Sequence, residues 1–481
     1  MRPTLVLACL IAILAPKAFP APIPVTNQKQ LFFDDRFIEA SENTHRRMNQ
    51  GQKIGPLLDQ NGNRINGHVN QVMEEGGKVR LYIGADSLTI YESDDGLHFT
   101  HTGQSIGRGV FPTLLVDTHE SDPAKRYKMF YLTLDTPFDT AKHGVQAAYS
   151  ADGVNFTEAG QVLPFYCDNP PIVLWDGRIN AYVIYTRVLE RDAENERRIT
   201  RMVTDDPLKP WPYTKTDKDD WLLTPANSAT ILETDAEDDP YSDFYYNSAT
   251  IYPWAQNTYL MALAPFRHFM PNRQPFLRPK APGQWEDFGV LEIQLAVSRD
   301  GIHWERPSRE PYFPTGLGDE WDRWYATMAQ GIARRGNYLY QYYTSSGRTH
   351  DGLIIRAEYD DVKELGGVGA IKQRLDGYYS IDTDHKGGWL ETPVITFTGN
   401  KLRLNIDTGA MGTAFVELRD ESGTPIPGFT LEDCEEIGGN FIDQAVYWKG
   451  NSDVSSLAGK PVKMHIKLTR GKLYAFQFAE E

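Results

Sequence analysis

The sequence predicts an all-β protein, a five-bladed β-propeller followed by a C-terminal β-sandwich. Short runs rich in Val, Ile, Tyr, Phe and Thr alternate with polar turns along the chain, as β-strands do. One turn motif recurs beside these runs at spacings typical of propeller blades. From Gly377 onward the pattern changes to about a hundred residues of alternating strand-length runs, which is typical of a β-sandwich.

Residues 1–21 predict a cleavable signal peptide. Arg2 gives a positive start, and Leu5 to Leu14 form an uncharged apolar run that is too short to cross a bilayer. Lipid attachment at Cys9 is a less favoured alternative, because much of the apolar run follows that residue. No later segment approaches the length of a membrane span, so we expect a secreted or periplasmic protein without one.

Charge and cysteine content exclude several functions. The chain has 481 residues and a formal net charge of −16, a balance that repels nucleic acid and anionic membranes. Sulfated or uronic-acid substrates are not excluded, because a local basic pocket could bind them. After the leader, Cys167 and Cys434 stand in different predicted domains. We expect two buried thiols, and two cysteines cannot build a cysteine-based zinc site.

A repeated hairpin divides the first part of the chain. Each repeat has a polar turn followed by an aromatic-rich strand, at 79–83, 128–132, 181–185, 258–262 and 338–343. Beside it stands the motif S-x-D-G-x-x-(F/W), at 93–99, 150–156 and 298–304, with a proline-bearing variant at 204–211. Asp-Gly suits a tight turn, Ser can bond back to the turn backbone, and the aromatic residue can close over the hairpin.

Counting these hairpins gives five units with the length of propeller blades. They cover 66–105, 110–162, 168–225, 244–310 and 324–362. We therefore expect a propeller over 27–375 and a β-sandwich accessory domain over 376–481.

The segment from Cys167 to Arg178 resembles a blade opening of the five-bladed propeller glycosidases, the superfamily of glycoside hydrolase families 32, 43, 62, 68 and 117. In those proteins an Asp near the start of an innermost strand faces the axial pocket. The opening at 31–35 and the stretch at 428–434 make the whole chain similar to a group of secreted planctomycete and verrucomicrobial proteins. The first resemblance implies a secreted glycoside hydrolase that acts on a poly- or oligosaccharide, with inversion as the commoner outcome.

A propeller glycosidase needs two carboxyl groups across the scissile bond, one protonated and one ionised. Asp168 is the first candidate, because it precedes an apolar strand at a blade opening; capping a turn is its alternative role. Asp35, beside Asp34, is the second, since acids flanked by apolar runs must be paired or functional. A salt link to Arg36 or Arg46 explains these two acids at least as well.

Glu320 and Asp322 are candidates for the general acid. They stand beside Trp321 and Trp324, and desolvation in an aromatic wall raises the pKa of a carboxyl group. The alternative is a solvated loop whose tryptophans pack on the propeller face.

The candidate substrate-binding residues lie at the predicted pocket ends of strands, and ordinary hydrogen bonding between blades is their alternative role. They are His68, Asn70, Asp243, Tyr245, Arg267, His268, Trp324, Arg348 and His350. We expect no cofactor. The acidic segment 235–243 could hold Ca²⁺, but its spacing does not match the helix-flanked calcium loop, so a solvated acidic loop at the pocket rim is favoured.

Other functions remain open. A non-catalytic carbohydrate-binding propeller would keep the aromatic pocket without a complete acid pair, and a phosphorolytic or purely structural propeller is less favoured. In the sandwich, Trp389 or Trp448 could stack on a sugar ring, although packing against the propeller is the more common role of such a domain.

Overall fold

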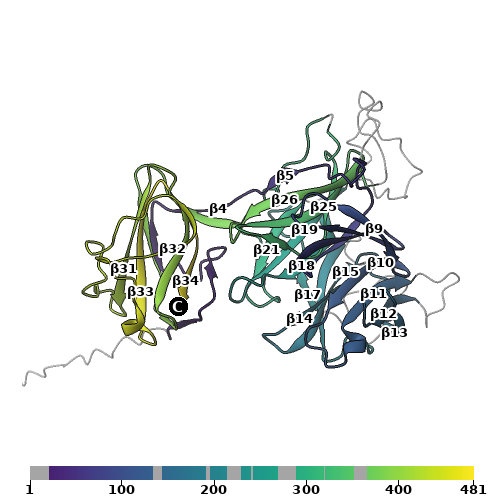
Figure 1. The fold of residues 1–481 in the computed structure, drawn as a ribbon, viewed down its shortest axis with the longest axis horizontal. Coiled ribbons are helices and arrows are strands. Elements are labelled where there is room, and N and C mark those ends of the chain that lie inside the picture. The colour runs from purple at the N-terminus through teal and green to yellow at the C-terminus, as the bar shows by residue number, and fades with distance from the viewer. Residues whose placement is uncertain are drawn as a thin grey trace, which may run out of the picture.

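The computed structural model describes residues 21–133, 143–190, 196–213, 229–239, 242–268, 289–318, 320–350 and 366–480. Within these ranges the strands form seven sheets. Five sheets make the propeller and two make the sandwich, which lie side by side in Figure 1. The predicted leader falls on residues outside the described ranges, apart from Ala21.

Four blades are built from consecutive antiparallel strands. Blade 1 has β6 (Val69–Glu75), β7 (Lys78–Ile83), β8 (Leu88–Ser93) and β9 (Thr100–Ile106). Blade 2 has β10 (Val110–Val116), β11 (Tyr127–Thr133), β12 (Gly144–Ser150) and β13 (Thr157–Leu163), with the short 3₁₀ helix η1 (Pro123–Lys125). Blade 3 has β14 (Ile172–Asp176), β15 (Ala181–Glu190), β16 (Glu196–Thr204) and β17 (Ala229–Leu232). Blade 4 has β18 (Ser242–Ile251), β19 (Tyr259–His268), β20 (Gly289–Leu291), β21 (Gln294–Ser298) and β22 (Trp304–Glu305).

The fifth blade takes its outer strand from the other end of the propeller sequence. It contains β23 (Tyr325–Met328), β24 (Ala333–Arg335), β25 (Tyr338–Ser346) and β26 (Gly366–Arg374). The outer position is filled by β5 (Gln52–Ile54), which pairs antiparallel with β26 through Ile54 and Ala370. Strand pairing between the two ends closes the ring, and blade 5 extends beyond the predicted unit 324–362.

Hydrogen bonds join each inner strand to the next around the propeller axis. Gln71 of blade 1 bonds the backbone of Leu114 in blade 2 through both of its amide atoms, at 2.5 and 2.7 Å. The remaining links join neighbouring blades in order and return to blade 1. They are Thr113 to the Pro171 carbonyl, Asn169 to the Tyr245 carbonyl, Ser248 to the Met328 carbonyl, and the Val72 amide to the Gln330 carbonyl.

The repeated turn motif forms the structure expected of it. In blade 1, the Ser93 hydroxyl donates to Asp95 and accepts from the Gly96 amide at 2.9 Å, while Asp95 accepts from the next two backbone amides. Gly96 has a φ of +83°, a conformation that favours glycine. The copies at 150–153 and 298–301 repeat these bonds. All three motifs connect the last two strands of a blade.

The sandwich uses strands from both ends of the chain. Its C-terminal strands are β27 (Tyr379–Asp382), β28 (Gly388–Glu391), β29 (Ile395–Phe397), β30 (Lys401–Asp407), β31 (Thr413–Asp420), β32 (Asn440–Ala445), β33 (Val462–Thr469) and β34 (Lys472–Ala479), with the 3₁₀ helix η4 (Ser455–Leu457). The N-terminal segment adds β1 (Ile23–Val25), β2 (Gln30–Leu31), β3 (Ala40–Glu42) and β4 (His45–Met48).

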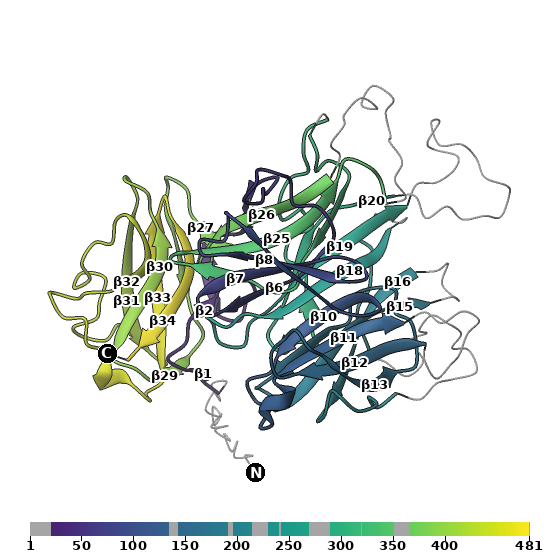
Figure 2. The ribbon, with the colours of Figure 1, turned by 45° about the vertical axis from the view of Figure 1, so that its right-hand side comes forward.

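These four N-terminal strands pair with the sandwich sheets and not with a blade. β1 pairs with β29, β2 with β34, β3 with β28 and β4 with β27. Figure 2 shows the purple N-terminal strands β1 and β2 beside the sandwich. The expected division placed this segment with the propeller, because its strands of two to four residues carry no sequence signal for a partner more than 300 positions away.

Burial separates the two sandwich tryptophans. Trp448 is 2% exposed and donates to the Val416 carbonyl, so it belongs to the sandwich core. Trp389 is partly exposed and donates to Glu42 at 3.0 Å. Cys167 and Cys434 are buried thiols outside any disulfide, as expected. Among the described residues, no helix is long and apolar enough to cross a membrane.

Candidate functional site

Strained backbone lies in the inner strand of blade 2 and in the segment just before the inner strand of blade 3. Phe111 has a φ of +50° and Asp168 a φ of +48°, in the left-handed region that side chains other than Gly seldom adopt. Each such residue costs about 1–3 kcal/mol and persists where the surrounding structure imposes it. At Phe111 the pairing of β10 with β11 also shifts register, as in a β-bulge. Such strain is concentrated at functional sites.

Asp168 is a partly exposed carboxylate held by a buried cation. Its side chain is 42% exposed, whereas that of Arg187 is only 5% exposed. Arg187 Nη2 lies 2.5 Å from Asp168 Oδ2, and Nη1 donates to the Tyr245 carbonyl at 3.1 Å. The guanidinium carbon also lies 4.6 Å from the centre of the Tyr245 ring. Arg187 therefore fixes Asp168 in one place while the carboxylate stays accessible.

Asp243, at the start of the blade 4 inner strand, is a second and buried carboxylate. Its Oδ2 lies 3.0 Å from Arg197 Nη1 and 3.2 Å from His268 Nε2. Burial alone would raise the pKa of Asp243, but the hydrogen bonds and positive charges of His268 and Arg197 outweigh it and hold this pKa below its ordinary value. Oδ1 is buried and has no hydrogen-bond partner among the described residues. Asp243 is thus held ionised.

His68 is a partly buried histidine that bonds to two neighbouring side chains through its ring nitrogens. His68 Nδ1 lies 2.6 Å from Asn70 Oδ1, and Nε2 lies 3.4 Å from Thr327 Oγ1. Burial lowers the pKa of His68 to about 4, because it disfavours the imidazolium. His68 is therefore neutral at neutral pH, and the bond to Asn70 assigns its proton to Nδ1.

His350 reaches the same site from the loop after β25. Its Nε2 lies 2.6 Å from the Tyr245 hydroxyl, and its ring centre is 4.7 Å from that of Tyr245. Burial raises the pKa of the Tyr245 phenol, so this hydroxyl stays protonated at neutral pH. Tyr245 thus has Arg187 over its ring and His350 at its hydroxyl. Together these side chains form an axial site with an accessible carboxylate, imidazoles and groups that can form hydrogen bonds with a polar ligand.

The structure brings together seven of the residues predicted from sequence at this axial site. They are His68, Asn70, Asp168, Asp243, Tyr245, His268 and His350. It places Asp35, Glu320 and Asp322 away from this site, and Arg267 and Trp324 on a neighbouring cavity.

Asp35 lies between β2 and β3 in the segment that pairs with the sandwich. Its side chain is 82% exposed and forms an ion pair with Arg46. The neighbouring Asp34 accepts from Arg299 at 2.8 and 2.9 Å, which ties this segment to blade 4. The salt link to Arg46 accounts for Asp35, which is not retained as a catalytic residue, whereas Asp34 pairs with Arg299 and not with Arg36 or Arg46.

Glu320 and Asp322 make contacts that stabilise their own loop and blade 5. Glu320 is exposed and accepts from the Leu317 amide at 2.7 Å. Asp322 is buried, pairs with Lys53 of the outer strand β5 at 2.9 Å, and accepts from the Tyr343 hydroxyl at 3.0 Å. An acid bound to the outermost strand of blade 5 is away from the axis. Arg348 is exposed on the loop after β25, which also carries His350.

Arg267 and Trp324 line a cavity of about 390 Å³ beside blade 4. Glu292 also lines it, and burial raises the pKa of this carboxyl. Arg267 is exposed, while Trp324 is partly buried. This rim cavity, as we call it, is a separate recess with a wall of mixed charge.

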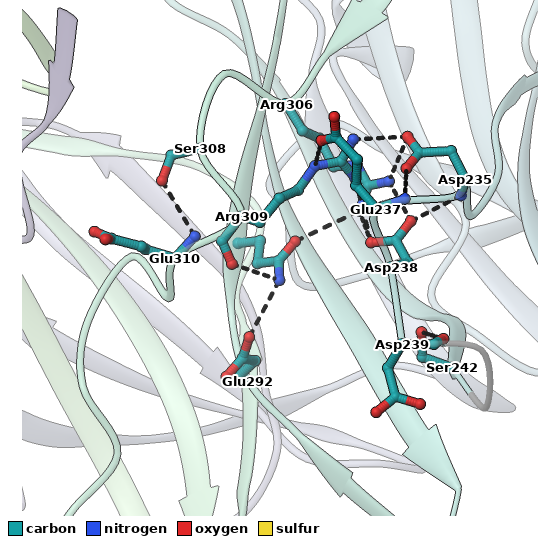
Figure 3. A network of polar contacts seen from close by, with 11 residues as sticks. Asp235, Glu237, Asp238, Asp239, Ser242, Glu292, Arg306, Ser308, Arg309 and Glu310 are labelled. Atoms are coloured by element: carbon teal, nitrogen blue, oxygen red, sulfur yellow. Dashed lines mark hydrogen bonds and ion pairs between the residues drawn. The ribbon is translucent and has the colours of Figure 1, made fainter. Parts of the chain in front are cut away.

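The acidic segment at 235–239 forms one side of the rim cavity, and its carboxylates pair with arginine side chains. Arg306, whose side chain is 2% exposed, lies 2.5 Å from Asp238 and 3.2 Å from Asp235. Arg309 pairs with the same two acids at 3.2 and 2.6 Å (Figure 3). These pairs neutralise the carboxylates that a Ca²⁺ ion would need. The interpretation as a fully solvated loop is also incomplete, since Asp238 is nearly buried.

Arg187 and Arg197 are the axial residues that sequence reasoning missed. Both lie in middle strands of blade 3, one of them at the end of the apolar run that begins at Ala181. A buried cation must be paired, so an Arg that ends an apolar strand predicts a carboxylate partner nearby. That signal could have identified Arg187, although not which acid it meets.

Comparisons with known proteins give a likeness of fold. No sequence profile of a known family matches the chain, and no curated protein matches it in sequence. Among solved structures, a thermostable family-43 glycoside hydrolase is 14% identical, with a TM-score of 0.40 over 67% of this chain and 93% of the other.

Two further structures cover more of the chain. A family 43 arabinoxylan arabinofuranohydrolase from Bacillus subtilis, in complex with cellotetraose, is 12% identical over 87% of this chain and 97% of its own, with a TM-score of 0.37. An exo-β-1,3-galactanase from Phanerochaete chrysosporium, with galactose, is 9% identical over 89% and 99%, with a TM-score of 0.36.

Proposed function

We propose that this protein is a glycoside hydrolase that cleaves a poly- or oligosaccharide at the axial site, with Asp168 as the general base. One observation supports this role above the others. Asp168 combines an accessible carboxylate, a strained position just before the inner strand β14, and a buried arginine that fixes it. A base must reach a water molecule and keep one orientation, and Asp168 meets both needs.

The proton donor is assigned to His350. Hydrolysis requires an acid that protonates the leaving oxygen as well as a base. Asp243 is held ionised, and His68 is neutral at neutral pH, so neither is suited to donate. His350 bonds the hydroxyl of Tyr245, whose ring also contacts Arg187, the partner of Asp168, and an imidazole is a common general acid.

In the proposed reaction, Asp168 takes a proton from a water that attacks the anomeric carbon. His350 protonates the glycosidic oxygen as its bond to that carbon breaks. Asp243, Arg197 and His268 bind and orient the sugar. Because Asp168 acts on water and not on the sugar, the proposed stereochemical outcome is inversion. A secreted or periplasmic location is part of the same proposal.

A non-catalytic saccharide-binding propeller is the second candidate function. It is favoured by the pairing of both axial carboxylates, Asp168 and Asp243, with arginines. Neither acid occupies the apolar, unpaired environment that makes a carboxylic acid a strong proton donor. Such a site would bind sugar hydroxyls without turnover.

Incubation with a panel of plant and algal polysaccharides and aryl glycosides separates the two functions, with released sugars read by chromatography. The proposal predicts release by the wild type and a loss of about 10²–10⁴-fold in Asp168→Asn. Asp35→Asn and Glu320→Gln are matched controls at exposed positions off the axis and should keep wild-type rates. Tight binding of one saccharide without release would favour the second function.

A further inference from the structure

The rim cavity, about 390 Å³ in volume, is a recess that the proposed axial chemistry does not use. Ser242 at the start of β18 lines it, as does Arg267, which pairs with Ser242 near the end of β19. The next residue along each strand, Asp243 or His268, belongs to the axial site. Consecutive side chains of a strand point to opposite faces. The rim cavity therefore lies across the end of the β18–β19 hairpin from the axial site.

Trp324 gives the rim cavity a fixed aromatic wall. Its side chain is partly exposed and lines the cavity. The Trp324 carbonyl accepts from the Leu291 amide, and the Trp324 amide donates to the Ser346 carbonyl, each at 3.2 Å. Pro265, Val290 and Leu291 extend the apolar part of the wall. Because backbone bonds hold Trp324 to both blade 4 and blade 5, its place is set before a ligand enters.

Glu292 is a carboxyl group on the same cavity without an ion-pair partner among the described residues. Its Oε1 accepts from the Gln294 amide at 3.1 Å, and that amide also donates to the Arg309 carbonyl at 3.0 Å. Burial raises the pKa of Glu292, because no positive charge offsets the desolvation of its carboxylate. Figure 3 shows Glu292 beside the arginine–aspartate pairs of the acidic segment. The group is suited to hydrogen bonds with an uncharged ligand.

The charges around the rim cavity disfavour an ionic ligand. Arg309 is paired with the acidic segment, and Arg323 is only 2% exposed. Among the described lining residues, this leaves Arg267 as the cation with an accessible head group, since its side chain is 54% exposed and lies 3.9 Å from Asp239. Glu237 is exposed on the same cavity. An anion would thus meet more negative than positive charge, and a metal cation would have to displace arginines from their carboxylates.

We propose that the rim cavity is a second saccharide site, which binds a short segment of a neutral oligosaccharide. The C–H face of a sugar ring packs on Trp324, and its hydroxyls bond to Glu292 and Arg267. A sugar ring has an apolar face and a polar edge, which matches the apolar wall and polar rim of a cavity in the usual size range of ligand sites. The proposal rests on the saccharide specificity of the proposed function and not on catalysis at Asp168.

Fluorine-19 NMR of the full chain labelled with 5-fluorotryptophan tests the site. The protein carries Asp168→Asn, so that the probes are not cleaved. The chain has ten tryptophans, and the spectra of Trp324→Phe and Trp389→Phe assign two of their signals. The probes are xylotriose, cellotriose and β-1,3-galactotriose, with trigalacturonate as the charged comparison. We expect a neutral probe to shift the Trp324 signal until it saturates, while the Trp389 signal from the sandwich stays in place.

The same titration in variants measures the polar contacts. Arg267→Ala and Glu292→Leu should each weaken binding about three- to tenfold, because each removes hydrogen bonds to the sugar. Glu292→Gln should keep most of the affinity, since an uncharged polar group can make the same bonds. Arg47→Ala, at an exposed arginine that lines a different cavity, should leave binding unchanged. Trigalacturonate should bind at least about tenfold more weakly than the neutral probe.

A Trp324 signal that no neutral probe moves would overturn the proposal. A response at Trp389 alone would overturn it as well, because the sugar would then lie on the sandwich. Equal or tighter binding of trigalacturonate, or binding unaffected by both Arg267→Ala and Glu292→Leu, would also contradict it. Sugar release by the wild type is a separate readout. Release without a Trp324 response would remove the rim site and keep the hydrolase, and a Trp324 response without release would do the reverse.

Discussion

The guanidinium of Arg187 lies 2.5 Å from the carboxylate of Asp168 and 4.6 Å from the ring centre of Tyr245. Arg187 is buried in a middle strand, so its position is set by the blade and not by the pocket. Arg187 therefore holds Asp168, which lies just before the inner strand β14, and the Tyr245 backbone in the next blade. The accessible carboxylate is therefore held in place by a residue that is nearly buried.

Arg187→Gln is expected to lower kcat by about 10–100-fold while KM changes little, because a displaced base is poorly aligned for water attack. Arg187→Lys should recover part of the rate, since it restores the charge without the fork geometry. Steady-state kinetics of both variants check this positioning role. A rise in KM with kcat unchanged would instead place Arg187 in sugar binding.

Asp243→Asn is expected to cost about 3 kcal/mol of stability at pH 7, because it leaves the buried Arg197 with a weakened partner. The pKa of Asp243 is held low in the folded state, so its stabilisation is present above about pH 4 and is lost as the pH falls through that lowered pKa. Urea unfolding at pH 7 and pH 3 should show a smaller difference between wild type and variant at pH 3. An equal difference at both pH values would contradict this account.

His68 is expected to stay neutral down to about pH 5, since burial lowers its pKa to about 4. Nitrogen-15 chemical shifts of the histidine rings, followed from pH 8 to pH 4, measure this directly. The Nδ1–H tautomer should persist through pH 6, because Nδ1 bonds to Asn70. His68→Phe identifies the resonance. Titration near pH 6.5 would show that the ring is solvated.

Gly301→Ala is expected to destabilise the protein more than Gly336→Ala. Both glycines have positive φ, +70° and +59°, so a side chain is strained at either position. At Gly301 an added Cβ would also lie 2.6 Å from the Tyr185 hydroxyl, whereas nothing lies within 4 Å at Gly336. The extra cost should be about 1–3 kcal/mol by chemical denaturation. An equal loss of stability in the two variants would show that the Tyr185 side chain moves to accommodate the added methyl group.

Local sequence signals predicted the blades well. The aromatic-rich runs all form second strands, because a polar turn and a period-two pattern are local features. The three serine–aspartate–glycine turns could be predicted for the same reason. The places of β1 to β5 were not, since each depends on a partner hundreds of positions away.

The site was predicted in part. Asp168 and Asp243 could be identified because one lies just before an inner strand and the other at the start of one, and inner strands converge at the axis. Asp35 and Asp322 could not be distinguished from them by sequence. An acid in apolar surroundings gives the same sequence pattern whether its partner is a substrate or a basic side chain. Their partners, Arg46 and Lys53, become visible only once the N-terminal strands are placed.

Chemical rescue of Asp168→Ala by azide, on a substrate that the wild type cleaves, tests the central claim most directly. If Asp168 is the base that activates water, azide attacks without needing it. It should then restore turnover at least about tenfold from a rate lowered 10²–10⁴-fold. The product should be a glycosyl azide of inverted configuration, and azide should not rescue His350→Ala. Wild-type rates in Asp168→Ala, or no rescue together with unchanged hydrolysis by His350→Ala, would contradict the proposed chemistry.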